Sequence, residues 1–217
     1  VDELLDKADI DAVTNTTPDA FHKEISIKVI NKNKHIFCEK PLAENYQDAK
    51  EMCDALKNKN LVNMVNFSYR NSSGYQELVK VVQSGKIGNV IHMDANYYQS
   101  WLSTKYWGDW RKQNKWLWRL STNHGSMGTL GDIGVHIFDF ASFPIGPIKK
   151  LNAKLKTFES KGDKIKDYVL DANDSFISMV EFENGALGTI TSTRFATGYS
   201  NRLELRIFGD KGCLLYT

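Results

Sequence analysis

The segment Ile10-Asp11-Ala12-Val13-Thr14-Asn15-Thr16-Thr17-Pro18-Asp19 leads from a strand pattern directly into a helix start. Residues 10–14 favour a short strand, and Thr17 is expected to be the N-cap of the helix that follows. Pro18 then occupies the first helical position and Asp19 the first turn, where a negative charge suits the helix dipole. Further along, apolar residues recur at every fourth position, which predicts a buried stripe formed by Phe21, Ile25 and Val29.

The same succession of strand and helix continues along the first third of the chain. Residues 35–38 and 61–67 are strand candidates. Between them, the i, i+3, i+4 and i+7 positions of an amphipathic helix are occupied by Ala49, Met52, Cys53 and Leu56. Strands that alternate with single helices predict an α/β fold with a doubly wound parallel sheet, here part of a Rossmann domain over residues 1–68.

The front of this domain lacks a feature that the fold requires. All 15 glycines lie at or after Gly74. A dinucleotide-binding domain needs a glycine-rich turn after its first strand, because larger side chains would block the pyrophosphate. We therefore expect the chain to begin inside such a domain, with roughly 60 to 70 residues, about two strand–helix units, lying upstream.

Residues 69–217 have a different pattern. A helix with its apolar positions at Tyr75, Leu78, Val79 and Val82, closed by Gly85, precedes a strand over residues 90–98. Later, residues 176–182 and 186–194 flank Asn184-Gly185, the favoured dipeptide of a tight hairpin. These signals predict an α+β domain with a large, mainly antiparallel sheet that is incomplete at its C-terminal end.

Composition excludes several classes of protein. Lys plus Arg is 28 and Asp plus Glu is 26, a net charge of +2, which gives no reason to expect nucleic acid or an anionic membrane as partner. No apolar run approaches the length of a membrane span. The three cysteines, Cys38, Cys53 and Cys213, lack metal-ligand spacing, so we expect no metal and a cytoplasmic location. Cys38 and Cys53 are expected to be small buried residues.

Two short motifs indicate a site that handles protons. In Gly131-Asp132-Ile133-Gly134-Val135-His136-Ile137-Phe138-Asp139, the four-residue spacing of Asp132 and His136 would bring them to one face of a helix. An imidazole beside carboxylates can exchange a proton near neutral pH. In Cys38-Glu39-Lys40-Pro41, a lysine ends a strand at the edge of the sheet where open α/β folds bind ligands. Asp139 is expected to be a structural partner or a surface carboxylate.

These pieces, in this order, resemble the oxidoreductases of the Gfo/Idh/MocA family, which includes glucose-fructose oxidoreductase and inositol dehydrogenase. The resemblance rests on Asp11-Ala12-Val13 through Thr17-Pro18 and His22, Glu39-Lys40-Pro41, residues 66–70, residues 84–88 and residues 131–139. It implies a Rossmann domain that binds NAD or NADP and transfers hydride to or from a carbinol carbon of a sugar, polyol or cyclitol. It also implies a second domain whose sheet often serves for homo-oligomerisation.

By the same resemblance, Lys40 would lie beside substrate and nicotinamide, His136 would accept or donate the proton, and Asp132 would assist it or hold a substrate hydroxyl. These roles agree with the chemistry, since the cofactor takes a hydride while the proton needs a base. The expected cofactor contacts are Asn15, Thr16, Thr17, Pro18, His22, Glu39, Lys40 and Arg70.

An aromatic stretch precedes the Asp/His motif, with Trp101, Tyr106, Trp107, Trp110, Trp116 and Trp118. Aromatic rings stack on sugars, but tryptophans equally close a core or an interface. We expect most to be structural, with Trp118 and Arg119 as substrate contacts. His124 is interpreted as a loop residue. Contact with the substrate is the alternative interpretation.

Two other functions stay open at this stage. The chain could be a non-catalytic sugar-binding or regulatory member of the same fold, or a subunit whose main role is assembly through the C-terminal sheet. The presence of Lys40, Asp132 and His136 together favours the enzyme.

Overall fold

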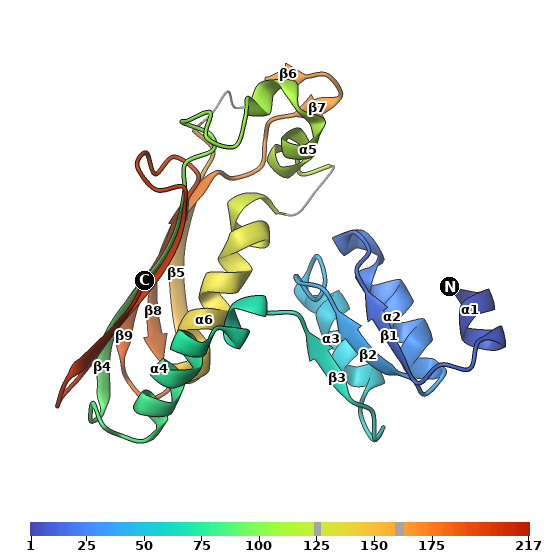
Figure 1. Ribbon diagram of the computed structural model, residues 1–217, viewed down its shortest axis with the longest axis horizontal. Coiled ribbons are helices and arrows are strands. Elements are labelled where there is room, and N and C mark those ends of the chain that lie inside the picture. Colours follow the sequence, from blue (N-terminus) through green and yellow to red (C-terminus); the bar gives the residue numbers. More distant parts are fainter. Residues whose placement is uncertain (124–126, 159–162) are drawn as a thin grey trace. The chain divides into compact units, whose positions relative to one another are not determined.

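The computed structural model describes residues 1–123, 127–158 and 163–217 (Figure 1). These residues form two compact units, Val1–Phe67 and Ser68–Thr217, and each is described by itself.

The first unit is a parallel three-stranded sheet with its helices. The strands β1 (Ala12–Asn15), β2 (His35–Cys38) and β3 (Asn63–Val65) lie in that order, with β2 paired in parallel to both neighbours. The connections carry α2 (His22–Asn31) and α3 (Tyr46–Ala55), and α1 (Asp2–Lys7) precedes β1. The apolar core joins α1, α2 and β2 through Leu5, Val29, Ile30, Ile36 and Cys38. The predicted Rossmann arrangement is therefore confirmed.

The helix start after β1 differs from the prediction. Pro18 precedes a 3₁₀ turn, η1 (Asp19–Phe21), and α2 begins only at His22. Thr17 is not the N-cap, because its hydroxyl points back and donates to Oδ1 of Asn15 over 2.8 Å. Phe21 lies in the tighter turn, out of phase with the stripe of α2, and is 52% exposed instead of buried.

The two cysteines of this unit differ in burial. Cys38 is buried on β2, as expected. Cys53 is exposed on α3, where Met52 takes the buried position, so the expectation of a buried Cys53 was wrong. A single-residue step on a helix turns a side chain by about 100°, which is enough to exchange core for solvent.

The second unit is built on a six-stranded sheet in the order β11-β10-β4-β9-β8-β5. Its strands are β4 (Val90–Gln99), β5 (Ile148–Lys156), β8 (Ser175–Phe182), β9 (Leu187–Thr193), β10 (Asn201–Gly209) and β11 (Cys213–Tyr216). All neighbours are antiparallel except β4 and β9, so the sheet is mainly antiparallel as predicted. The sequence did not single out β5, because its lysines leave both faces exposed beyond Ile148.

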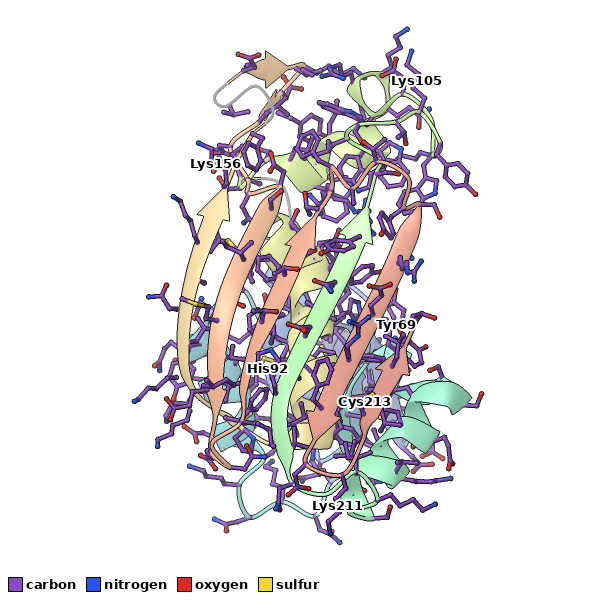
Figure 2. The ribbon with its side chains drawn as sticks, turned by 90° about the vertical axis from the view of Figure 1, so that its left-hand side faces the viewer. Tyr69, His92, Lys105, Lys156, Lys211 and Cys213 are labelled. Carbon is purple, nitrogen blue, oxygen red and sulfur yellow. The ribbon has the colours of Figure 1, made fainter. Side chains whose placement is uncertain are left out.

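Two helices cover one face of this sheet, as Figure 1 shows: α4 (Ser73–Gln83) and α6 (Val135–Ile145). The core between them and the strands includes Tyr75, Ile137, Phe140, Phe176 and Leu205. Figure 2 looks onto the other face, which carries no helix and has His92 on it. Among the described residues, no helix is long and apolar enough to span a bilayer.

A smaller aromatic cluster lies at one end of this unit. It comprises α5 (Asn114–Leu117), the 3₁₀ turns η3 (Trp110–Lys112) and η4 (Trp118–Leu120), and the ribbon of β6 (Lys164–Ile165) and β7 (Tyr168–Val169). Trp101 and Trp110 are buried there, and Trp116 stacks on Trp101 and Trp107. Most of the tryptophans therefore build a local core.

The turn that carries Asp132 is wider than an α-helix. Residues Leu130–Gly134 form a π-helical turn, η5, whose bonds close from i to i+5, and α6 begins only at Val135. Asp132 therefore lies in the π-helical turn and His136 in the first turn of α6, and the prediction that the two share one face of the helix stays a prediction. Gly131 and Gly134 weaken α-helical propensity here, and the ring of Phe176 packs where a side chain at Gly134 would stand, 2.9 Å from its Cβ position.

Candidate active site

The carboxyl ends of the three parallel strands are tied together by hydrogen bonds. Asn66, just after β3, donates to one carboxylate oxygen of Glu39, which follows β2. The Glu39 amide in turn donates to the carbonyl of Asn15 at the end of β1 over 2.9 Å. Such an edge is where open α/β sheets bind their ligands. Glu39 and Asn15 thus fix the shape of this edge.

Asn15 is fully engaged. Its side-chain amide donates to the carbonyl of His22 and to Oγ of Ser26, while its Oδ1 accepts from the amide and hydroxyl of Thr17. The side chain is buried. It therefore shapes the loop of residues 15–18, in which Thr16 and Pro18 are the more accessible residues.

His22 lies beneath the same edge, with its ring fully buried. Its Nδ1 is 2.7 Å from the carbonyl oxygen of Pro41, and its Nε2 is 2.8 Å from that of Thr17. One ring thus contacts both the loop after β1 and the turn after β2. Lys40, in that turn, is half-buried, and its amide donates to the Glu39 carboxylate.

In the second unit, Asp132 is held by two arginines. Nη2 of Arg194 donates to its Oδ2 over 2.8 Å, and Nε of Arg119 lies 3.5 Å from the same oxygen. Arg194 is fully buried, donates from Nη1 to the carbonyl of Arg119, and has its guanidinium 4.9 Å from the ring centre of Trp101. Burial lowers the pKa of Arg194, and the charge of Asp132 opposes this. The guanidinium nevertheless keeps its proton, so the carboxylate has a fixed cationic partner.

Two tyrosines lie beside the other residue of the motif. The buried ring of His136 meets that of Tyr69 edge to face, with centroids 5.0 Å apart. The hydroxyls of Tyr69 and Tyr97 share a short hydrogen bond. Burial, together with the bond from Tyr69, raises the pKa of Tyr97, so this phenol stays protonated near neutral pH. The imidazole therefore lies in an aromatic setting, against the ring of Tyr69.

Other candidates take part in packing contacts. Arg70 pairs through two nitrogens with the carboxylate of Asp139 and lies 4.0 Å above the ring of Phe143. Asp139 is therefore a structural partner. Trp118 is half-buried with the guanidinium of Arg119 4.2 Å from its ring centre. His124 lies outside the described residues.

The structure thus groups Asn15, Thr17, His22, Glu39 and Lys40 at one edge of the first unit, and Arg119, Asp132 and His136 around η5 and α6 of the second. Arg194, Tyr69 and Tyr97 were not among the predicted site residues. A signal for Arg194 exists in the sequence: it continues the inward register of Ile190 and Ser192 just beyond β9, where a charge is unexpected.

Comparison with known proteins defines the class. Residues 1–67 match the family model described as an oxidoreductase family with an NAD-binding Rossmann fold, and residues 75–215 match that of the GFO/IDH/MocA C-terminal domain. The chain therefore belongs to the Gfo/Idh/MocA family of oxidoreductases. The resemblance drawn from its motifs and the expected class of cofactor, a nicotinamide dinucleotide, are both confirmed.

The names of its relatives describe dehydrogenases of sugars and cyclitols. Levoglucosan dehydrogenase of Pseudarthrobacter phenanthrenivorans is 32% identical over 98% of this chain and 57% of its own length. Myo-inositol 2-dehydrogenase of Thermotoga maritima is 26% identical over 97% of this chain and 57% of its own length. A solved levoglucosan dehydrogenase in complex with NADH and levoglucosan superposes with a TM-score of 0.87 at 32% identity, covering 100% of this chain and 56% of that one. The chain thus spans a little over half the length of these relatives.

Proposed function

We propose that the protein containing this chain is an NAD(P)-dependent dehydrogenase that acts on a CH–OH group of a sugar, polyol or cyclitol. The observation that carries the proposal is the membership of both units in one family of oxidoreductases, with Asp132 in a π-helical turn and His136 in the first turn of the helix that follows. The cofactor supplies hydride acceptance or donation when bound. The residues of the chain would supply the proton chemistry and the binding.

We assign the proton steps to three residues. His136 would take the hydroxyl proton as the carbinol carbon loses its hydride, since imidazole exchanges protons near neutral pH. Lys40 would stabilise the developing alkoxide charge with its ammonium group. Asp132, oriented by Arg194, would hold a substrate hydroxyl or favour the imidazolium.

The binding residues follow from position and exposure. At the carboxyl edge of the first sheet, where the cofactor would bind, Thr16 and Pro18 are exposed and Lys40 is half-buried. Asn15, Thr17 and Glu39 shape that edge. Arg70 stays a weaker candidate, because its guanidinium is occupied by Asp139. In the second unit, Trp118 with Arg119 stacked on it would contact the substrate ring.

The decisive experiment is the substitution His136→Ala in the complete polypeptide, assayed with NAD, NADP and a panel of sugars and cyclitols. We expect kcat to fall about 10²- to 10⁴-fold, the usual contribution of a general base, with the Kd of NADH unchanged. His35→Ala is the control, since His35 accepts a bond from Val62 and has no proposed role. Unchanged turnover would remove His136 from the mechanism, and sugar binding without cofactor binding or turnover would favour a non-catalytic sugar-binding protein.

A second test addresses whether Lys40 acts with His136. Lys40→Met and the double variant Lys40→Met/His136→Ala are compared with the single variants. Residues that serve one reaction step are strongly non-additive, so the double variant is expected to be little worse than the poorer single one. If the loss of activity in the double variant equals the product of the two single losses, Lys40 and His136 do not act in one step.

We also propose that the protein forms a homo-oligomer through the open face of the C-terminal sheet. An antiparallel sheet with one solvated face normally alternates apolar and polar residues. Here three outward positions, Ile177, Met179 and Leu187, are apolar, and all three are more than 50% exposed. Figure 2 shows this face without any covering helix. Such a patch is typical of an interface.

A further inference from the structure

Both ring nitrogens of His22 face hydrogen-bond acceptors. Nδ1 lies 2.7 Å from the carbonyl oxygen of Pro41, and Nε2 lies 2.8 Å from that of Thr17. A neutral imidazole carries one N–H, so one of these carbonyls would meet a nitrogen lone pair. Only the imidazolium donates to both. The geometry therefore favours a ring that is protonated on both nitrogens.

The groups that face the ring support the charge. Burial by itself lowers the pKa of His22, but the thiol of Cys38 on β2 and the carbonyls of Pro41 and Thr17 raise it to about 9 overall. Ser26, one turn further along α2, donates from its hydroxyl to Sγ of Cys38 over 3.8 Å. The adjacent cation, Lys23, is paired with Asp48 and Glu51 of α3. An imidazolium is thus the stable form in this pocket at neutral pH.

The two carbonyls belong to segments that the proposed function uses. Thr17 is in the loop after β1, and Pro41 directly follows Lys40 in the turn after β2. A backbone bond from the Glu39 amide to the Asn15 carbonyl joins the two segments at their bases. The bonds of His22 join them further along the chain, next to Lys40. Loss of one ring proton would release one of the two segments.

We propose that His22 is a positioning residue, a buried imidazolium that holds the loop of residues 15–18 to the turn carrying Lys40. This inference rests on the proposed function, in which both segments border the cofactor. It gives His22 an indirect role in place of a direct cofactor contact, because its fully buried ring is enclosed by the two carbonyls. The consequence is that the geometry of the edge depends on the protonation of a residue that touches neither cofactor nor substrate.

The first test observes the ring itself and requires no activity. The complete protein is labelled with ¹⁵N in its histidine side chains, and the ring signals are assigned with the variant His22→Gln. We expect both His22 nitrogens to carry protons at pH 7, and the signal to titrate only near its pKa of about 9. A non-protonated ring nitrogen at pH 7 would overturn the proposal.

The second test measures binding of NADH across pH. In the wild type the Kd is expected to rise as pH increases through 9, because one segment is released. His22→Gln, which reaches one carbonyl at most, is expected to bind about tenfold more weakly at pH 7, as the loss of a charge-assisted bond implies, and without that pH dependence. The matched control His35→Gln, in the same unit, should retain the wild-type profile.

The outcomes separate this inference from the proposed function. If His22→Gln is folded and binds NADH with the wild-type affinity and pH profile, the positioning role is wrong although the dehydrogenase stands. If wild type and both variants all fail to bind NADH or NADPH, the proposed function fails, while the ring signals still decide whether the imidazolium joins the two segments. If His22→Gln does not fold, the test uses the wild type. The pH at which its Kd for NADH rises must then equal the pH at which the ¹⁵N signals of His22 titrate, and a difference between the two would refute the inference.

Discussion

Arg194 donates from Nη2 to Oδ2 of Asp132 over 2.8 Å, and its side chain is entirely buried. A second bond, from Nη1 to the carbonyl of Arg119, fixes the plane of the guanidinium. The carboxylate at the π-helical turn is therefore oriented by a cation that follows directly after β9, and it cannot rotate without breaking that bond. This pair defines the orientation of the Asp/His motif.

Replacement of this arginine should be costly. We expect Arg194→Met to lower the free energy of unfolding by about 3 to 5 kcal/mol, as is usual when one partner of a buried ion pair is removed. Urea unfolding followed by circular dichroism gives the value. The control is Arg202→Met, which breaks the more exposed pair with Glu204 and should cost less than about 1 kcal/mol. Equal losses in the two variants would show that Arg194 does not stabilise Asp132.

Stability should fall at alkaline pH because of His22. Its pKa is about 9 in the folded state against 6.5 for an ordinary histidine, so folding favours the protonated ring. The contribution is fully present below pH 6.5 and is lost as pH rises through 9. It amounts to roughly 3 kcal/mol between these limits, because each tenfold gain in proton affinity corresponds to about 1.4 kcal/mol. Urea titrations at pH 6.5 and at about pH 9.5 measure it. His22→Gln should lose this part of the pH dependence, and an identical slope in the variant would contradict the assignment.

Gly128 should not tolerate a side chain. Its φ is +65°, and a Cβ there would stand 2.3 Å from the carbonyl oxygen of Asn173. That carbonyl accepts from the amide of Thr129, and Oδ1 of Asn173 accepts from that of Leu130, so the start of η5 depends on this approach. Gly128→Ala is expected to cost about 3 kcal/mol or more, from strain and lost bonds together.

Gly85 offers the matched control for this substitution. Its φ is +72°, but nothing lies within 4 Å of the position that a Cβ would take, so Gly85→Ala carries the backbone strain without the collision. A cost of about 1 to 2 kcal/mol is expected from the left-handed conformation by itself. Thermal or urea unfolding of both variants gives the difference, and equal costs would show that the Asn173 contact is unimportant.

Charges on the open sheet face should weaken self-association. Ile177 and Met179 are 61% and 64% exposed on β8. We expect Ile177→Lys/Met179→Lys to shift the particle measured by light scattering to a smaller mass, because like charges from both protomers would meet in a symmetric interface. Val62→Lys, an exposed apolar site in the first unit, is the control. A wild-type mass that is already monomeric, or that the paired lysines leave unchanged, would refute the proposed interface.

Local signals along the chain were sufficient for much of the fold. The alternation of short strands with amphipathic helices predicted the parallel sheet of the first unit, and Tyr75, Leu78 and Val79 mark the buried side of α4 as expected. The hairpin of β8 and β9 turns at Asn184-Gly185 as predicted, with Gly185 at a φ of +88°. Such features depend on residues only a few positions apart in the chain. They can therefore be predicted from the residue types and their spacing.

The wrong prediction of the helix start after β1 was also based on local sequence signals. A proline after a capping residue is compatible with both an α-helix and a 3₁₀ turn, and the choice between them at Asp19–Phe21 accompanies the burial of His22 under Pro41. Likewise, the four-residue spacing of Asp132 and His136 does not reveal that the turn at Asp132 is π-helical. Local propensity is too weak to decide such cases against tertiary contacts.

By itself, the sequence determined the alternating strands and helices of the first unit, the family and the residue types of the candidate site. Only the tertiary structure decided their partners: Arg194 joins Asp132 from 62 positions away, Tyr69 meets Tyr97, and β4 pairs in parallel with β9. Contacts of this kind come from the packing of elements distant in the chain, where burial removes water and makes one geometry far more stable than its alternatives. No pattern within a short window contains that information, because the free energy that selects the partner belongs to the folded core.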